Sequence, residues 1–155
     1  MVSRTRSGRA PSLVLAVLLS LPAVASAVGS GPAPTPAAPR SAEAEYNTGL
    51  EAKTASRFAD AAVSFRRAVD IRPSYAEAWN ELGFALRQTG RYDDALGAYD
   101  RALALRPNFP EALEYLGETY VKLGRLADAR AILERLTPLD AARADELSQA
   151  IRTGR

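Results

Sequence analysis

The chain lacks cysteine and histidine altogether and has one tryptophan and one methionine among its 155 residues. Without cysteine it can form no disulfide and has no thiolate nucleophile, and without histidine it lacks the commonest general base. The same absences remove the soft ligands of zinc sites. We therefore expect no catalytic residues, no cofactor and no metal, and function is expected on a surface.

Long apolar runs are scarce too: one extends from Leu13 to Ala25, and Ser20 and Pro22 interrupt it. Arginines precede this run, and small residues follow it at the spacing that signal peptidase needs. We expect a signal peptide at 1–27, using the general secretory route because no arginine pair precedes the run. An uncleaved anchor is the alternative, although the run is shorter than the ~20 residues that cross a hydrocarbon core.

Neither sign of charge dominates the chain. It has 20 basic and 18 acidic residues, and loss of three arginines with the signal peptide leaves 17 against 18. A nearly neutral product has no basic field for phosphate backbones, so nucleic acid is not an expected partner. Residues 28–41 are rich in proline, alanine and glycine and predict a disordered linker. We expect an exported protein, periplasmic rather than extracellular, with no stable membrane insertion after cleavage.

Beyond residue 41, four residue types return every 34 positions. The recurring sets are Gly49, Gly83 and Gly117; Arg57, Arg91 and Arg125; Asp60, Asp94 and Asp128; Ala61, Ala95 and Ala129. A period of this length is typical of stacked helix pairs, each of which buries its apolar face against a neighbour. Apolar periodicity and the Pro and Gly breaks predict helices at 42–55, 59–71, 76–88, 92–105, 110–123, 126–136 and 139–151.

These copies resemble the tetratricopeptide repeat family, whose pattern places Trp, Leu, Gly and Tyr on a first helix and Ala, aromatic, Ala and Pro on a second. The matching residues are Gly49, Ala61, Phe65, Ala68 and Pro73; Trp79, Leu82, Gly83, Ala95, Tyr99, Ala102 and Pro107; Leu116, Gly117, Tyr120 and Ala129. The second copy departs at Leu86, where the family prefers Tyr, and the third has Leu133 where Phe is usual.

The resemblance implies an all-α, right-handed superhelical solenoid. Its repeats would span 42–75, 76–109 and, in degenerate form, 110–137, and a C-terminal capping helix would span 138–152. We expect each glycine of the 34-residue pattern to face the alanine of its partner helix, because two small residues let the helices approach closely. Phe65 and Tyr99 are expected to fill the space between successive repeats.

Two groups of carboxylates have an alternative interpretation. Asp93 and Asp94 could act as an acid–base pair, but they begin a predicted helix, where acidic residues offset the helix dipole. Glu111, Glu114 and Glu118 share one helix face and could suggest calcium. A hard cation needs more converging oxygens than one face provides, so an acidic stripe lining a groove is the preferred interpretation.

In the family, the first helix of each repeat lines the concave side and carries the partner contacts. Carried over by position, the predicted groove consists of Tyr46, Leu50 and Lys53; Asn80, Phe84, Arg87 and Gln88; Glu114, Glu118, Val121 and Lys122. Aromatic and Arg side chains often concentrate binding energy, which favours Tyr46, Phe84 and Arg87 as anchors. The alternative is that Tyr46 and Phe84 are partly buried in helix packing.

Some family members clamp the C-terminal carboxylate of chaperones with Lys, Asn and Arg. Tyr46 and Leu50 stand where Lys and Asn would be needed, so chaperone-tail binding is not expected. The acidic third repeat favours a basic or neutral partner segment. The sequence thus predicts a non-catalytic protein-binding module, an adaptor or assembly factor of the bacterial envelope. The alternative is a solenoid that self-associates through its end repeats.

Overall fold

The computed structural model describes residues 40–154. The chain divides into two units, Met1–Ala37 and Ala38–Arg155, and only the second is described below. The predicted signal peptide (1–27) and residues 28–39 of the predicted linker lie outside the described residues.

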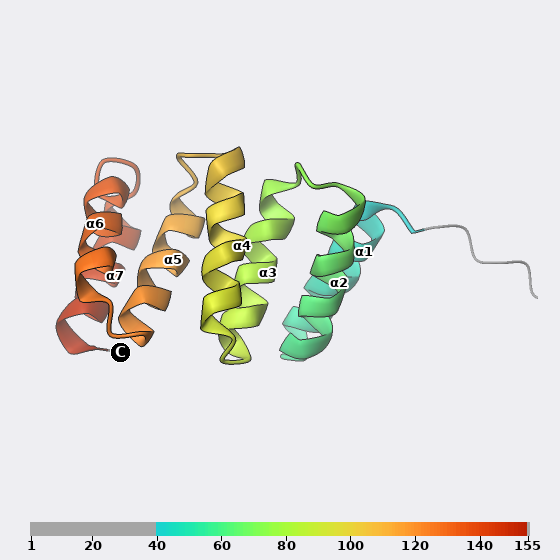
Figure 1. The fold of residues 1–155 in the computed structure, drawn as a ribbon, viewed down its shortest axis with the longest axis horizontal. Helices are drawn as coiled ribbons and strands as arrows, with labels where there is room; N and C mark the ends of the chain where they lie inside the picture. Colours follow the sequence, from blue (N-terminus) through green and yellow to red (C-terminus); the bar gives the residue numbers. More distant parts are fainter. Residues whose placement is uncertain (1–39, 155) are drawn as a thin grey trace, which may run out of the picture. The chain divides into compact units, whose positions relative to one another are not determined.

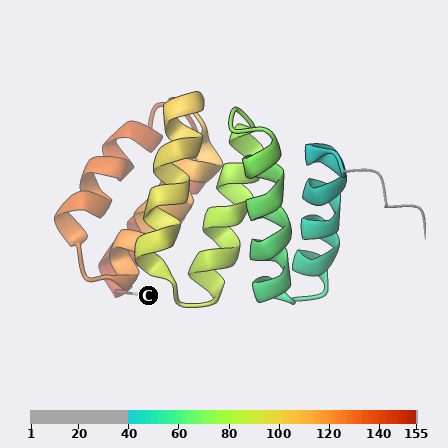
Figure 2. The same ribbon diagram turned by 45° about the vertical axis from the view of Figure 1, so that its right-hand side comes forward.

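The described residues form seven helices and no strand. These are α1 (Ala42–Thr54), α2 (Phe58–Ile71), α3 (Ala76–Gln88), α4 (Tyr92–Leu105), α5 (Pro110–Lys122), α6 (Leu126–Leu136) and α7 (Ala141–Thr153). The pairs α1–α2, α3–α4 and α5–α6 stand side by side in a row, and α7 packs on the last pair (Figures 1 and 2). The predicted all-α stack of helix pairs is confirmed.

The turn inside each helix pair has the same geometry. Gly90 and Gly124 adopt left-handed conformations with φ of 77° and 71°, and Ser56 does so at the equivalent position of the first pair. The amide of the next residue donates to the carbonyl five residues back: Arg57 to Ala52, Arg91 to Leu86 and Arg125 to Tyr120. This is how a helix with a left-handed terminal residue satisfies its last carbonyls.

The periodic arginines and aspartates belong to these turns. Arg57, Arg91 and Arg125 each precede the second helix of a pair. Each guanidinium contacts an aspartate three residues on, with N–O distances of 3.1 Å to Asp60, 2.6 Å to Asp94 and 2.7 Å to Asp128. An acidic group in the first turn also offsets the helix dipole. The pattern therefore fixes the start of each second helix.

The glycines of the first helices lie against large side chains. A Cβ on Gly83 would lie 2.6 Å from Cε1 of Tyr99, and one on Gly49 would lie 2.5 Å from Cε1 of Phe65. We expected the glycines to face alanines and the rings to lie between repeats, and the structure differs. Each ring reaches back to the glycine of its own pair, although Tyr99 also approaches Tyr115 of the next pair, with ring centroids 6.2 Å apart.

The remaining residues of the repeat pattern are buried, with four exceptions. Trp79 and Tyr120 are half-buried, and Pro73 and Pro107 are exposed at the ends of the pairs. Among the described residues, the buried apolar core extends from Ala42 to Leu147 and lies within the seven helices except for Phe109, which precedes α5. This part of the chain therefore has a hydrophobic core of its own.

Helix α7 completes the third pair. Leu133 occupies the position of Phe65 and Tyr99 but is only half-buried, and its branched side chain is shorter than either ring. The side chain nearest to Gly117 comes instead from α7, where Leu147 is fully buried. Asp140 caps the N-terminus of α7, because its carboxylate accepts a hydrogen bond from the Arg143 amide at 3.1 Å.

Candidate functional site

Aromatic and basic side chains gather on the first helices of the three pairs. We call the set Tyr46, Lys53, Phe84, Arg87, Tyr115 and Glu118 the α1–α3–α5 surface. All six side chains are half-buried, so each presents part of its area to solvent. They come from helices of the same place in each repeat, which the 34-residue period brings side by side.

Rings and cations alternate across this surface. The centroids of Phe84 and Tyr115 are 5.3 Å apart. The Lys53 ammonium lies 4.5 Å from the Phe84 centroid, and the Arg87 guanidinium lies 5.6 Å from Phe84 and 5.3 Å from Tyr115. Rigid aromatic faces next to an arginine are typical of residues that anchor a protein partner.

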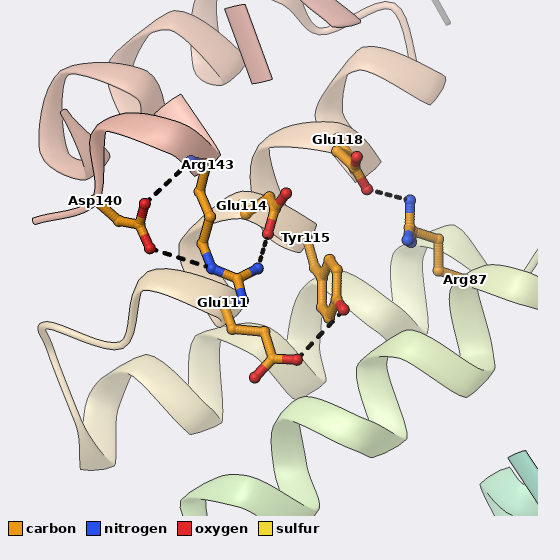
Figure 3. A network of polar contacts seen from close by, with 7 residues as sticks. All are labelled: Arg87, Glu111, Glu114, Tyr115, Glu118, Asp140 and Arg143. Carbon is orange, nitrogen blue, oxygen red and sulfur yellow. Dashed lines mark hydrogen bonds and ion pairs between the residues drawn. The ribbon is translucent and has the colours of Figure 1, made fainter. Parts of the chain in front are cut away.

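Ion pairs connect each first helix to the next part of the chain. Lys53 of α1 binds Glu81 of α3, and Arg87 of α3 binds Glu118 of α5, each at 2.6 Å. In the last pair, Arg143 of α7 binds Glu114 of α5 (Figure 3). These pairs hold the cations in place, because both partners come from elements fixed by the core.

The carboxylate of Glu114 is the most strongly perturbed acid of this network. Its side chain is 4% exposed, and burial raises its pKa to about 7, although Arg143 opposes the shift. Burial likewise raises the pKa of the Tyr115 hydroxyl to about 12. Tyr115 donates a hydrogen bond to Glu111 at 3.3 Å, as Figure 3 shows. Glu111, Glu114 and Glu118 therefore take separate partners rather than converging on one point.

The predicted groove residues divide into three classes by exposure. Six are half-buried: Tyr46, Leu50, Lys53, Phe84, Arg87 and Glu118. Gln88 and Lys122 are exposed. Asn80, Glu114 and Val121 are buried, with exposed fractions of 1%, 3% and 4%. These last three were expected to line an open groove, but the rest of the protein covers their side chains.

Sequence reasoning missed Tyr115, Glu81 and Arg143. Tyr115 is not at one of the five positions carried over from the family, yet its ring lies between Phe84 and Tyr99. Its spacing of four residues from Glu111 and three from Glu118 was the available signal, since such residues share one face of a helix. Arg143 could not be found this way, because its position depends on how α7 docks.

Neither a metal-binding cluster nor a membrane-spanning helix occurs in the part of the chain that the structure describes. The described residues contain no group of three or more carboxylates placed to hold a metal ion. None of the helices in residues 40–154 combines the length and the apolar character needed to cross a bilayer.

Comparison with known proteins agrees with the sequence pattern. Two family models described as tetratricopeptide repeat match residues 46–108 and 86–152. No curated protein matches the chain. Together the two models cover 46–152, which includes the three helix pairs except for the first four residues of α1, and most of α7.

Solved structures share the fold. The TPR2B domain of yeast Sti1, in a complex with pHsp70, has a TM-score of 0.69 and 20% identity, over 74% of this chain and 98% of its own. The Arabidopsis OM64 TPR domain also scores 0.69, with 15% identity, over 74% and 97%. The Yersinia enterocolitica type III secretion chaperone SycD, in complex with a peptide of the translocator YopD, scores 0.66 with 19% identity, over 72% and 92%. With the repeat pattern, the helix pairs and the family match in agreement, this chain belongs to the tetratricopeptide repeat family.

Proposed function

We propose that this protein is an exported, non-catalytic module that binds a segment of another protein on its α1–α3–α5 surface. Its role would be that of an adaptor or assembly factor in the bacterial envelope. The observation that carries the proposal is the row of half-buried rings, Phe84 and Tyr115, with Arg87 and Lys53 held over them. Such a row can pack against apolar side chains and hydrogen-bond to a peptide backbone.

The partner segment is proposed to be neutral. The acidic residues of α5 are compensated within the chain, since Glu118 binds Arg87 and Glu114 binds Arg143. Two of the similar structures contain a bound partner, pHsp70 for Sti1 and a YopD peptide for SycD. The Lys and Asn of the chaperone-tail clamp are replaced here by Tyr46 and Leu50, so a different kind of segment is proposed for this chain.

Crosslinking and affinity capture from the native cell envelope, followed by mass spectrometry, tests the proposal. The double variant Phe84→Ala with Arg87→Ala should lower capture of the main partner by about tenfold or more, because it removes the central anchors. A matched double variant, Leu105→Ala with Arg101→Ala, alters exposed side chains of α4 and should capture as the parent does.

Circular dichroism must show the parental helix content for each variant. If the Phe84→Ala, Arg87→Ala variant unfolds, the double variant Gln88→Glu with Lys122→Glu is used in its place. It changes two exposed residues, one on α3 and one on α5. Undiminished capture by a folded variant would place the partner elsewhere.

Light scattering on residues 28–155 tests the self-association alternative, since a monomer at micromolar concentration would exclude it. Cell fractionation with mass measurement of the mature chain tests export and cleavage at residue 27.

A further inference from the structure

A concave feature lies between α2 and α3. It is an open hollow of about 510 Å³, and none of its lining residues belongs to the α1–α3–α5 surface. The apolar wall on the α3 side consists of Leu82 and Leu86, each 1% exposed. The wall on the α2 side consists of Ala59, Ala62 and Val63. Small-molecule sites are typically apolar hollows of about 300–1,000 Å³ with a few polar groups.

One residue that lines the hollow, Leu86, is the position at which the second repeat departs from the family pattern. At the next interface, the residues 34 positions on from Ala59, Ala62 and Leu86 are Asp93, Leu96 and Tyr120. Each of these side chains is larger than its counterpart. Tyr120 is half-buried, and the Arg125 guanidinium lies 4.5 Å from its ring centroid. At the first interface the shorter side chain of Leu86 stands in place of this tyrosine and lines the hollow.

The rim of the hollow is basic. Arg66, Arg67 and Arg91 line it, and none of its nine lining residues is acidic. The Arg91 guanidinium forms an ion pair with Asp94, with an N–O distance of 2.6 Å, and that of Arg67 lies 3.9 Å from a carboxylate oxygen of Glu45. The Arg66 guanidinium instead lies 5.8 Å from the centroid of the Trp79 ring. The residue equivalent to Arg66 at the next interface is Asp100, whereas those equivalent to Arg67 and Arg91 are Arg101 and Arg125, so one of the three rim charges differs between the two interfaces.

We infer that the hollow between α2 and α3 binds a small amphipathic anion, a single alkyl chain that ends in a carboxylate. The alkyl chain would lie against Val63 and Ala59, over the floor that Leu82 and Leu86 form, and the carboxylate would contact Arg66 with Arg67. Val63 is 52% exposed, so this ligand would cover an apolar side chain that now faces solvent. An arginine fork matches the geometry of a carboxylate.

Isothermal titration calorimetry on residues 28–155 with decanoate, below its micellar concentration, tests this inference. We expect saturable binding of one molecule per chain and weaker binding of decanol, which lacks the charge. Decyltrimethylammonium should not bind. Each methylene removed from the ligand should weaken binding about three- to fourfold, as long as that part of the alkyl chain lies in the hollow. The single tryptophan, Trp79, provides an independent fluorescence readout beside Arg66.

Leu86→Tyr is the decisive variant, since it copies the residue that occupies this place at the next interface. It should fill the hollow and weaken decanoate binding by about tenfold or more, because about two methylenes or more lose their contact. If Leu86→Tyr fails to fold, Ala62→Leu copies Leu96 and serves instead. Arg66→Gln should weaken the binding of decanoate but not the binding of decanol. Arg101→Gln, which changes an exposed arginine of α4, is the matched control.

Several results would overturn the inference. These are undiminished decanoate binding by a folded Leu86→Tyr variant, equal binding of decyltrimethylammonium, and uptake of several molecules per chain. Tighter binding of an acidic apolar peptide, sensitive to Leu86→Tyr, would also overturn it and assign the hollow to a protein segment. None of these results bears on partner capture through the α1–α3–α5 surface, so the two proposals fail independently.

Discussion

A glycine in each of the first helices leaves no room for a methyl group. Gly83→Ala would place Cβ 2.6 Å from Cε1 of the Tyr99 ring, which is fully buried and cannot move aside. We expect this change to lower the free energy of unfolding by about 1–3 kcal/mol, the usual cost of overfilling a core. Chemical denaturation followed by circular dichroism measures it.

Gly97→Ala is the matched control within the same repeat. Gly97 lies inside α4, and a Cβ there would meet no atom within 4 Å. The same substitution should therefore raise the free energy of unfolding by about 0.5–1 kcal/mol, since alanine loses less backbone entropy in a helix. Equal effects of the two substitutions would show that the Gly83 contact is not a constraint.

The buried carboxyl of Glu114 makes stability depend on pH. Its pKa is raised from 4.5 to about 7, so the folded chain binds this proton more tightly than the unfolded chain does. The stability it contributes is fully present below pH 4.5 and is lost as the pH rises through about 7. Glu114→Gln should therefore reduce the fall in unfolding free energy across this pH range.

Other charged groups surround Glu114. Arg143 and Glu146 face it from α7, and Glu118 lies on its own helix. The control is Glu134→Gln, which removes an exposed carboxyl of α6 and leaves this cluster intact. Denaturation curves at several pH values compare the parent with both variants. If the free energy of unfolding depends on pH in the same way in the parent and in Glu114→Gln, the pH dependence does not come from Glu114.

At the scale of helices, the 34-residue period and the breaks at Pro and Gly predicted six helices to within one residue at each end. The seventh was predicted at 139–151 and begins two residues later, at Ala141. Asp140 lies in an extended conformation and caps it, while the Leu139 amide donates to Leu136 in the preceding turn. Local patterns locate a helix well, but the cap geometry decides where it begins.

The candidate surface was less predictable than the helices. Tyr46, Phe84 and Arg87 are half-buried, which both the groove prediction and the alternative of helix packing require, so their binding role stays a prediction. The groove prediction did not foresee that Asn80 and Glu114 are buried. Their exposure depends on how closely the next repeat and α7 pack, and this long-range packing leaves no local pattern in the chain.

Helix α7 supplies the side chain that the third repeat lacks. Leu147→Ala should leave a cavity beside Gly117 and lower the free energy of unfolding by about 2–5 kcal/mol. Leu139→Ala, the same substitution at a residue that is 38% exposed just before α7, should change it by about 0.5 kcal/mol or less. Equal losses in urea denaturation would show that α7 does not complete the core.

At the scale of the whole molecule, stability should be graded along the stack. Helix α3 packs against helices on both sides, whereas α1 forms the outer end of the row (Figure 1). The fully covered residues of α1 are Ala42, Glu45, Gly49 and Ala52, none of which is a large apolar residue. Those of α3 include Leu82 and Leu86. In repeat proteins each unit is stabilised by its neighbours, so an end helix opens more easily than a central one.

Hydrogen exchange followed by mass spectrometry should resolve this gradient. Amides of α1 are expected to exchange faster than those of α3, because local opening of α1 exposes less apolar surface. Ser41→Ala provides the control: its hydroxyl oxygen accepts from the Ala44 amide at 3.1 Å, and removal of such a cap costs about 1 kcal/mol. This variant should accelerate exchange in α1 and leave α3 unchanged. Equal acceleration in both helices would mean that they open together, and the chain would then unfold as one cooperative unit instead of from its end.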